Sequence, residues 1–267
     1  MNEGVSPQAK LLRAFSVEFL TAHNADVARR IMADEYCLSI CSVELGPRDS
    51  GYLPATVAQL DQFPGLCVTA HDVVIGRDAV ALRFTEHGVS AREQRTSSWG
   101  GITLFRIADG QLVRGWAEED YFARKLQLRS GEVNLISAPH PAPWDQPVSE
   151  PDVVTERVVR DWLADPQNLV GAMDEISAGG PPIRTLVTPV AVELSMLFTA
   201  GGRAAFHAVI TGTYAGGFED VSADRIGQPV TFPVAAIVDV IGDAVARVQL
   251  CGDRLGLHRS LTSAGAR

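Results

Sequence analysis

The chain has 267 residues, of which 46% are hydrophobic and 21% are charged. This hydrophobic fraction fills one large core or two smaller ones, which excludes an intrinsically disordered chain. The 24 glycines and 15 prolines are close to ordinary usage, so collagen-like and low-complexity classes are excluded as well. The formal net charge of −9, without any dense basic run, argues against nucleic-acid binding.

No apolar run approaches the roughly 20 residues that a membrane-spanning helix needs. The first ten residues lack the basic and apolar regions of a signal peptide. The four cysteines stand singly, without the Cys-x-x-Cys spacing of zinc sites. We therefore expect a cytoplasmic protein, bacterial by its Arg-rich composition, that binds neither membrane nor metal. Its reduced and mostly buried thiols would be Cys37, Cys41, Cys67 and Cys251.

Five prolines fall within a polar stretch near the middle of the chain, at positions 139, 141, 143, 147 and 151. Proline at this density disfavours helix interiors and central strands, and it favours extended backbone. A connection this long without helix or strand is uncommon inside a compact domain. We therefore predict a first domain over residues 1–130, a linker over 131–151 and a second domain over 152–267.

In the first half, apolar residues recur first with a helical period and then with a period of two. The expected helices cover 8–23, 25–33 and 54–62, and the expected strands cover 66–75, 79–87, 96–107 and 112–119, before a closing helix over 121–128. Helices followed by a meander of strands indicate an α+β fold, because alternating βαβ units are absent.

The second half repeats this order in reduced form. Its expected helices cover 152–163 and 168–177, and its expected strands cover 191–199, 204–214, 230–240 and 244–250. Residues 105–128 align with 238–261 without a gap, which pairs Asp120 with Asp253 at a period of 133 residues. This period is longer than a solenoid repeat, so it indicates a duplicated domain. The second copy is shorter, which predicts a smaller or collapsed second pocket.

Motifs of the first half follow a recognisable order: Phe63-Pro64, Asp78 to Val80, Gly88, Phe105-Arg106, Asp109-Gly110, Trp116 and Asp120. This order resembles the SnoaL-like polyketide cyclases of the nuclear-transport-factor-2-like superfamily, over most of residues 7–128 and more weakly over 152–261. The resemblance implies two cone-shaped domains, each with N-terminal helices on a curved antiparallel sheet around an apolar pocket. It also implies an internal pseudo-dimer packed sheet to sheet, and it leaves a homodimer of the whole chain open.

Side chains alternate faces along the strand over 112–119, so Trp116, Glu118 and Asp120 share one face with Arg114. We expect this face to project into the cone, where burial raises the pKa of a carboxyl group towards neutrality. The resemblance implies that Asp120 moves a proton during an intramolecular aldol ring closure, with no metal or organic cofactor. Glu118 and Asp120 are therefore candidate catalytic residues.

A structural interpretation of Asp120 competes with the catalytic one. Asp120 stands directly before a predicted helix, and its counterpart Asp253 stands before the last one. Aspartate is a favoured helix N-cap, which explains both positions without catalysis. Both roles stay open for Asp120, whereas the capping role is favoured for Asp253.

His87 shares a strand face with Arg83 and titrates near neutral pH in the absence of perturbation, so it is a third catalytic candidate. The side chains expected to contact a substrate are Arg83, Trp116, Tyr36, Trp99, Phe15 and Phe19.

Two functions follow from these residues. The first is a cofactor-free cyclase, isomerase or lyase that acts by proton transfer on a hydrophobic, polyketide- or terpenoid-like small molecule in the first domain. The second is a non-catalytic small-molecule-binding protein of the same fold. Epoxide-hydrolase-type chemistry is a further alternative, which needs a close Asp–Arg–Asp set. Ketosteroid isomerases share the fold that the resemblance implies, and they carry their base a few residues beyond an Ala-Asp-Asp stretch. The matching stretch here is Ala33-Asp34-Glu35, and no aspartate follows it closely, which disfavours that isomerisation.

Overall fold

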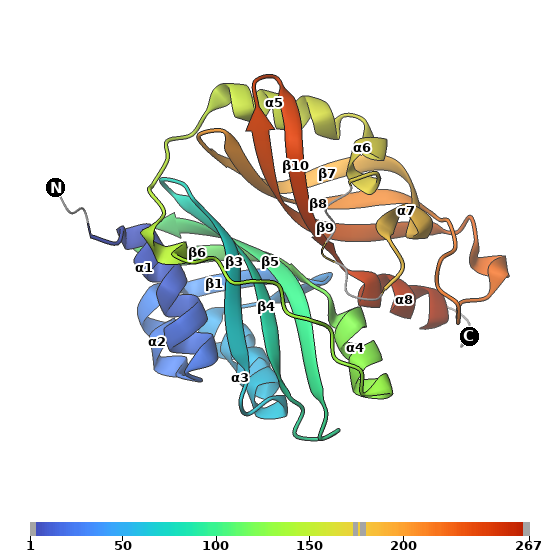
Figure 1. Ribbon diagram of the computed structural model, residues 1–267, viewed down its shortest axis with the longest axis horizontal. Helices are drawn as coiled ribbons and strands as arrows, with labels where there is room; N and C mark the ends of the chain where they lie inside the picture. The colour runs from blue at the N-terminus through green and yellow to red at the C-terminus, as the bar shows by residue number, and fades with distance from the viewer. Residues whose placement is uncertain (1–3, 173–175, 177–179, 264–267) are drawn as a thin grey trace.

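The computed structural model describes residues 4–172, 176 and 180–263. They form a six-stranded sheet from the first half of the chain and a four-stranded sheet from the second half, with helices packed on each (Figure 1). The α+β class predicted from the sequence is confirmed. No helix in the described part of the chain is long and apolar enough to cross a membrane.

The first half begins with helical segments that lie close to the ranges expected from the sequence, except for residues 48–52, where no helix was expected. They are α1 (Pro7–Arg13), η1 (Ala14–Thr21), α2 (Ala25–Ile31), η2 (Arg48–Tyr52) and α3 (Leu53–Gln62). The side chain of Ser6 caps the first of them. The helix expected over 8–23 is present, although its turns widen to a π-helix from Ala14 onwards.

The first sheet has the strand order β2–β1–β6–β5–β4–β3. Its strands are β1 (Met32–Ile40), β2 (Val43–Leu45), β3 (Cys67–Ile75), β4 (Ala79–Val89), β5 (Thr96–Ala108) and β6 (Gln111–Glu119). The sequence does not predict β1, which pairs in parallel with β6 and places Leu38 opposite Gly115. The sheet therefore combines the expected antiparallel meander with one parallel pair.

The two faces of this sheet have different neighbours. Val80 and Leu82 of β4 point towards the N-terminal helices and share a core with Phe19. Ala79 and Ala81, which alternate with them, belong to a separate core that is shared with the second sheet. Both faces of β4 are therefore buried.

The second half contains α5 (Val153–Leu163), α6 (Pro166–Val170), α7 (Ile183–Leu186), β7 (Val187–Ala200), β8 (Arg203–Tyr214), η4 (Ala223–Arg225), β9 (Pro229–Ile241), β10 (Ala244–Gly252) and α8 (Arg254–Ser263). Its strands are antiparallel in the order β10–β9–β8–β7. The helix expected over 168–177 is shorter, because α6 ends at Val170, and part of the expected range lies outside the described residues. No counterpart of β1 flanks β10 in the described chain.

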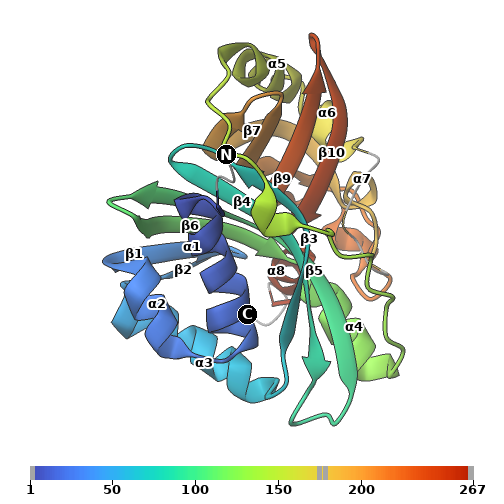
Figure 2. The same ribbon diagram turned by 60° about the vertical axis from the view of Figure 1, so that its left-hand side comes forward.

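The two sheets lie against each other (Figure 2). The apolar core between them includes several alanines from both sheets. Ala81 of β4 lies in this core with Ala205 of β8 and Ala235 of β9. An ion pair also joins the sheets, because Arg203 donates to both carboxylate oxygens of Asp72, at 3.1 and 2.7 Å. Face-to-face packing of the sheets is present, while a pseudo-twofold relation between the halves stays a prediction.

The proline-rich segment follows the outside of the first sheet from α4 (Tyr121–Ser130) to α5 (Figure 1). It hydrogen-bonds to β3, since the N–H groups of His140 and Ser149 donate to the carbonyls of Ala70 and Ile75, each at 2.9 Å. Its only regular element is the short η3 (Pro143–Asp145), which contacts α1. This segment covers the edge that β3 would otherwise expose.

Candidate active site

A cavity of about 90 Å³ lies inside the first half, between the six-stranded sheet and the helices η1 and α3. We call it the first-half cavity. Its apolar wall comes from Phe15, Leu20, Leu38, Ile40, Leu45, Ala55, Phe84 and Ala117. Its polar groups come from Tyr52, Thr56, Gln59, Glu86, Thr103, Glu119 and Tyr121. An apolar cavity with a few convergent polar groups is typical of a small-molecule site.

Two glutamates meet in the first-half cavity. Glu86 comes from β4 and Glu119 from the end of β6, and their exposed fractions are 2% and 7%. Strand β5 lies between them in the sheet, with Trp99 opposite Glu86 and Gly101 opposite Glu119. The two carboxyl groups are within hydrogen-bonding reach of each other. Such a buried pair is able to share one proton.

Gly101 makes room for this arrangement. A Cβ atom at this position would lie 2.6 Å from Cζ of Phe84 and 2.9 Å from Cγ of Glu119. Both distances are shorter than van der Waals contact, so any larger residue would displace one of the two side chains. The glycine therefore allows Glu119 to cross β5 towards Glu86.

Hydrogen bonds from three elements fix the orientation of the carboxyl groups. Nε1 of Trp99 donates to Oε2 of Glu119 at 2.9 Å. Nε2 of Gln59, from α3, donates to Oε2 of Glu86 at 2.8 Å. The hydroxyl of Tyr121 donates in turn to Oε1 of Gln59 at 3.2 Å. The pair is thus held in place before any ligand binds.

Burial is the main cause that raises the pKa of both glutamates. The charge of Glu119 raises the pKa of Glu86 further, to well above its ordinary value, whereas the hydrogen bond from Trp99 opposes the rise at Glu119. The guanidinium of Arg124, which lies 4.9 Å from the ring centroid of Trp99, lowers the pKa of both carboxyl groups. The pair therefore favours one shared proton over two charges, and Glu86, whose pKa is raised well above its ordinary value, is the group that holds a proton more readily.

Four of the five aromatic residues predicted to contact a substrate, all except Trp116, lie at this cavity or behind its wall. Phe15 lines it, and Trp99 holds Glu119. Phe19 lies behind Phe15, with 6.2 Å between their ring centroids, and Tyr36 packs on Tyr52 at 5.0 Å. Phe15 thus lines the cavity and Trp99 orients one of its carboxyl groups, while Phe19 and Tyr36 support its wall.

The expectation that Glu118 and Trp116 project into the cone is wrong. Glu118 points to the second half, where Nε2 of His207 lies 3.0 Å from its Oε1. Trp116 packs against the core between the sheets, and Arg114 stacks over its ring at 5.4 Å. The alternation along β6 is as predicted, but the face that carries Glu119, rather than Glu118, lines the cavity.

Asp120 and Asp253 both cap helices. Oδ1 of Asp120 accepts a hydrogen bond from the N–H of Ala123 at 3.1 Å, and Oδ1 of Asp253 accepts one from the N–H of Gly256 at 2.7 Å. Asp120 is buried but does not line the first-half cavity. The structure therefore accounts for both aspartates as N-caps.

His87 and Arg83 lie on the face of β4 opposite to Glu86. Nε2 of His87 is 3.1 Å from Oγ1 of Thr69, and burial lowers the pKa of the histidine. Arg83 lines a different cavity, beside the proline-rich segment. Neither residue reaches the glutamate pair. The pair itself was not predicted from the sequence. The available signal was Glu86 itself, a charged residue on the strand face that carries Val80, Leu82 and Phe84.

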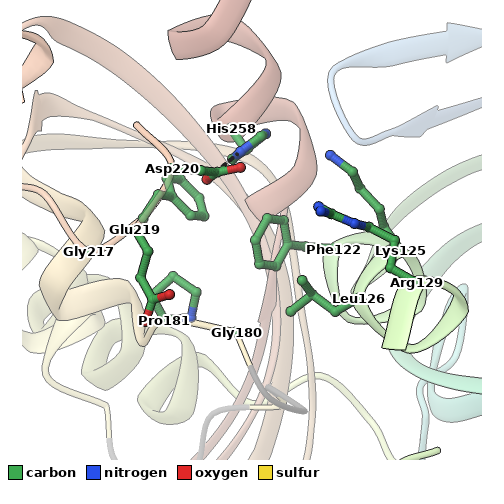
Figure 3. Close-up of a pocket in the computed structure, with 11 residues that line it drawn as sticks. Phe122, Lys125, Leu126, Arg129, Gly180, Pro181, Gly217, Glu219, Asp220 and His258 are labelled. Carbon is green, nitrogen blue, oxygen red and sulfur yellow. Dashed lines mark hydrogen bonds and ion pairs between the residues drawn. The ribbon is translucent and has the colours of Figure 1, made fainter. Parts of the chain in front are cut away.

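A second hollow, of about 540 Å³, lies where α4 meets α8 (Figure 3). Phe122, Phe218 and His258 form an aromatic wall, and Nε2 of His258 is 2.9 Å from Oδ1 of Asp220. This hydrogen bond lowers the pKa of Asp220, which is the opposite of what a general acid needs. The hollow is therefore a weaker candidate for acid/base chemistry than the first-half cavity.

No family model and no curated protein matches this chain. Solved structures are similar to about half of it. A protein described as a SnoaL-like polyketide cyclase from Jannaschia sp. CCS1 is 18% identical, with a TM-score of 0.44, over 48% of this chain and 96% of its own. AclR from Streptomyces galilaeus, described as a hydroxylase, is 16% identical, with a TM-score of 0.43, over 47% and 98%. An LEH-like epoxide hydrolase from M. tuberculosis is 13% identical, with a TM-score of 0.41, over 47% and 91%. The family that the sequence resembles is thus found among the similar structures.

Proposed function

We propose that this protein is an acid/base enzyme that needs no cofactor and transfers protons to and from a hydrophobic small molecule in the first-half cavity. The observation that carries the proposal is the buried pair Glu86 and Glu119, whose carboxyl groups lie within hydrogen-bonding reach of each other. In the proposed resting state one of these groups is neutral and the other is charged. A buried acid and base side by side supply both proton donor and proton acceptor near neutral pH.

Glu119 is the base in this mechanism and Glu86 the acid. The carboxylate of Glu119 removes a proton from a carbon next to a substrate carbonyl, while Glu86 gives its proton to the carbonyl oxygen, which yields an enol. The enol carbon then attacks a second carbonyl of the same molecule and closes a ring. Its hydroxyl proton returns to Glu86, and Glu119 protonates the new alkoxide. Reprotonation at another carbon would give an isomerase instead.

The cavity sets the kind of substrate. Its wall is mostly aliphatic and aromatic, which suits a polyketide- or terpenoid-like molecule. A volume of about 90 Å³ is smaller than the roughly 300 Å³ or more of ordinary ligand pockets, so it accommodates only the reacting part of such a molecule. All residues that line the cavity fall between Phe15 and Tyr121. We therefore propose residues 1–130 as the functional domain and residues 152–267 as mainly structural.

A non-catalytic binding protein is the second candidate, because Gln59 and Trp99 already occupy one oxygen of each glutamate. In that case the pair only anchors a ligand. Epoxide-hydrolase-type chemistry has less support, since neither an arginine nor an aspartate is among the described residues that line the cavity.

Proton exchange distinguishes catalysis from binding without knowledge of the natural substrate. Hydrophobic 1,3-dicarbonyl compounds would be incubated with the protein in D₂O, and exchange of the carbon-bound hydrogen would be followed by NMR. We expect Glu119→Gln to lower the exchange rate by roughly 10²–10⁴-fold, with Glu93→Gln, in an exposed turn, as the matched control. Exchange that is unchanged in Glu119→Gln, or absent in the native protein, would contradict the proposal.

A further inference from the structure

A second buried polar cluster joins the two halves of the chain. Cys41 lies in the turn between β1 and β2, Glu118 on β6, and Asp253 directly after β10. One ligand atom from each residue, the sulfur and one oxygen from each carboxyl group, lies within 4.8 Å of the others. Two of these residues belong to the first half and the third belongs to the second.

The cluster contains buried oxygens whose hydrogen bonding is incomplete. Oε2 of Glu118 and Oδ2 of Asp253 have no hydrogen-bond partner among the described residues, and both side chains are 1% exposed. A buried oxygen without a partner is costly, and two nearby carboxylates repel each other. A cation between the two carboxyl groups would remove both costs at once.

We propose that Cys41, Glu118 and Asp253 bind one zinc ion between the two halves of the chain. Zinc accepts thiolate and carboxylate ligands together, whereas magnesium and calcium prefer oxygen alone. Bond lengths of about 2.0–2.3 Å place tetrahedral zinc ligands about 3.6 Å apart, so the three groups need to close in by about 1 Å. The proton of the Cys41 thiol is released to solvent on binding.

The backbone at Cys41 supports a role for its side chain. Cys41 and Ser42 form the two-residue turn of a hairpin, with φ angles of 47° and 63°. Left-handed conformations at both positions favour glycine and asparagine. Cysteine is unfavourable in this backbone conformation, where glycine or asparagine would stabilise the turn better. Its presence therefore fits a role for the thiol.

His207 completes the arrangement around Glu118. The ring is able to donate from Nε2 to Oε1 of Glu118, at 3.0 Å, which leaves Oε2 for the metal. Carboxylates that bind metals are commonly oriented by such a second hydrogen bond.

Cobalt provides the test, because a cobalt–thiolate bond gives an ultraviolet charge-transfer band that zinc then abolishes by displacement. The protein would be stripped of metal with a chelator, reduced, and titrated with cobalt and then zinc. We expect one equivalent of cobalt to bind and zinc to raise the melting temperature. If the native protein showed no charge-transfer band and no shift in melting temperature, the proposal would be overturned.

Two variants make the assignment specific. Cys41→Gly removes the thiol and also suits the left-handed turn, so the variant should fold at least as well as the native protein. Asp253→Asn keeps a capping oxygen but removes a charge. We expect both to lose the band or to weaken cobalt binding at least tenfold, while Cys67→Ser, in β3, binds normally. A band that survives in Cys41→Gly would show that another thiol holds the metal.

Discussion

Glu118 and Glu119 are adjacent in β6, yet their carboxyl groups face different halves of the molecule. Glu119 lies in the first-half cavity, held by Trp99, whereas Glu118 lies between the sheets next to His207. Strand alternation produces this separation, and a shift of one residue in register would exchange the two environments. One strand therefore supplies both the proposed active site and the proposed metal site.

The position of Glu119 depends on Gly101. We expect Gly101→Ala to destabilise the fold by about 1–3 kcal/mol, because its Cβ would collide with Phe84 and Glu119. Proton exchange should fall as well, since the two glutamates move apart. Gly65→Ala is the control, because nothing lies within 4 Å of a Cβ built there. Urea unfolding and the exchange assay would measure both effects, and a Gly101→Ala variant with native activity would contradict the geometry.

Asp120 offers a second test, because its cap and its charge are separable. Asparagine retains a side-chain oxygen for the N–H of Ala123, whereas alanine does not. Asp120→Ala should therefore be less stable than Asp120→Asn by about 1 kcal/mol. Exchange activity should be unchanged in Asp120→Asn, since Asp120 lies outside the cavity. A folded Asp120→Asn protein without activity would return Asp120 to the list of catalytic residues.

Elements that were bounded by turn residues could be predicted from the sequence. Gly76-Arg77-Asp78 separates β3 from β4, and the period of two is clear on both sides. β1 has the same alternation at Tyr36, Leu38 and Ile40, which are all buried. It was missed because it follows α2 directly, without a glycine or proline between them.

The location of the site was harder to predict for a physical reason. The first sheet is covered on both faces, by helices on one side and by the second sheet on the other. Alternation divides β6 into two sets of side chains, but it does not tell which set faces the helices. The tryptophan at 116 and the acids at 118 and 120 suggested that their face of the strand lines the cavity. The opposite face does so instead, and there Glu119 follows the small residues Gly115 and Ala117. The proposed zinc ligands Cys41, Glu118 and Asp253 likewise come from three distant segments, so no local spacing in the sequence reveals them.

The ion pair between the sheets should contribute more to stability than a surface pair. Arg203 binds Asp72 through two nitrogens and also donates to Asp239 at 2.7 Å. We expect Arg203→Ala to cost about 1–3 kcal/mol, because it leaves the mostly buried Asp72 without its cation. Arg77→Ala removes an exposed pair with Glu150 and should cost less than about 0.5 kcal/mol. Equal losses of stability in urea unfolding would contradict this account of the interface.

The glutamate pair also predicts how stability changes with pH. The pKa of Glu86 is raised above its ordinary value of 4.5, so the folded protein binds more protons than the unfolded chain above that pH. The free energy of unfolding should therefore fall as the pH rises from about 5 towards the raised pKa. In the metal-free protein, which this measurement uses, the buried carboxyl groups of Glu118 and Asp253 also have raised pKa values and act in the same direction.

Glu86→Gln isolates the contribution of Glu86, because glutamine is nearly isosteric and neutral at every pH. Relative to the native protein, this variant should gain stability steadily as the pH rises from 5 to 9. Its own curve should still slope downward, since Glu118 and Asp253 remain. Glu93→Gln is the control: a hydrogen bond from Ser90 lowers the pKa of Glu93, so this glutamate does not take up an extra proton on folding. Its curve should run parallel to the native one. If the curve of Glu86→Gln were also parallel, Glu86 would not hold the extra proton, and the acid in the proposed mechanism would be wrong.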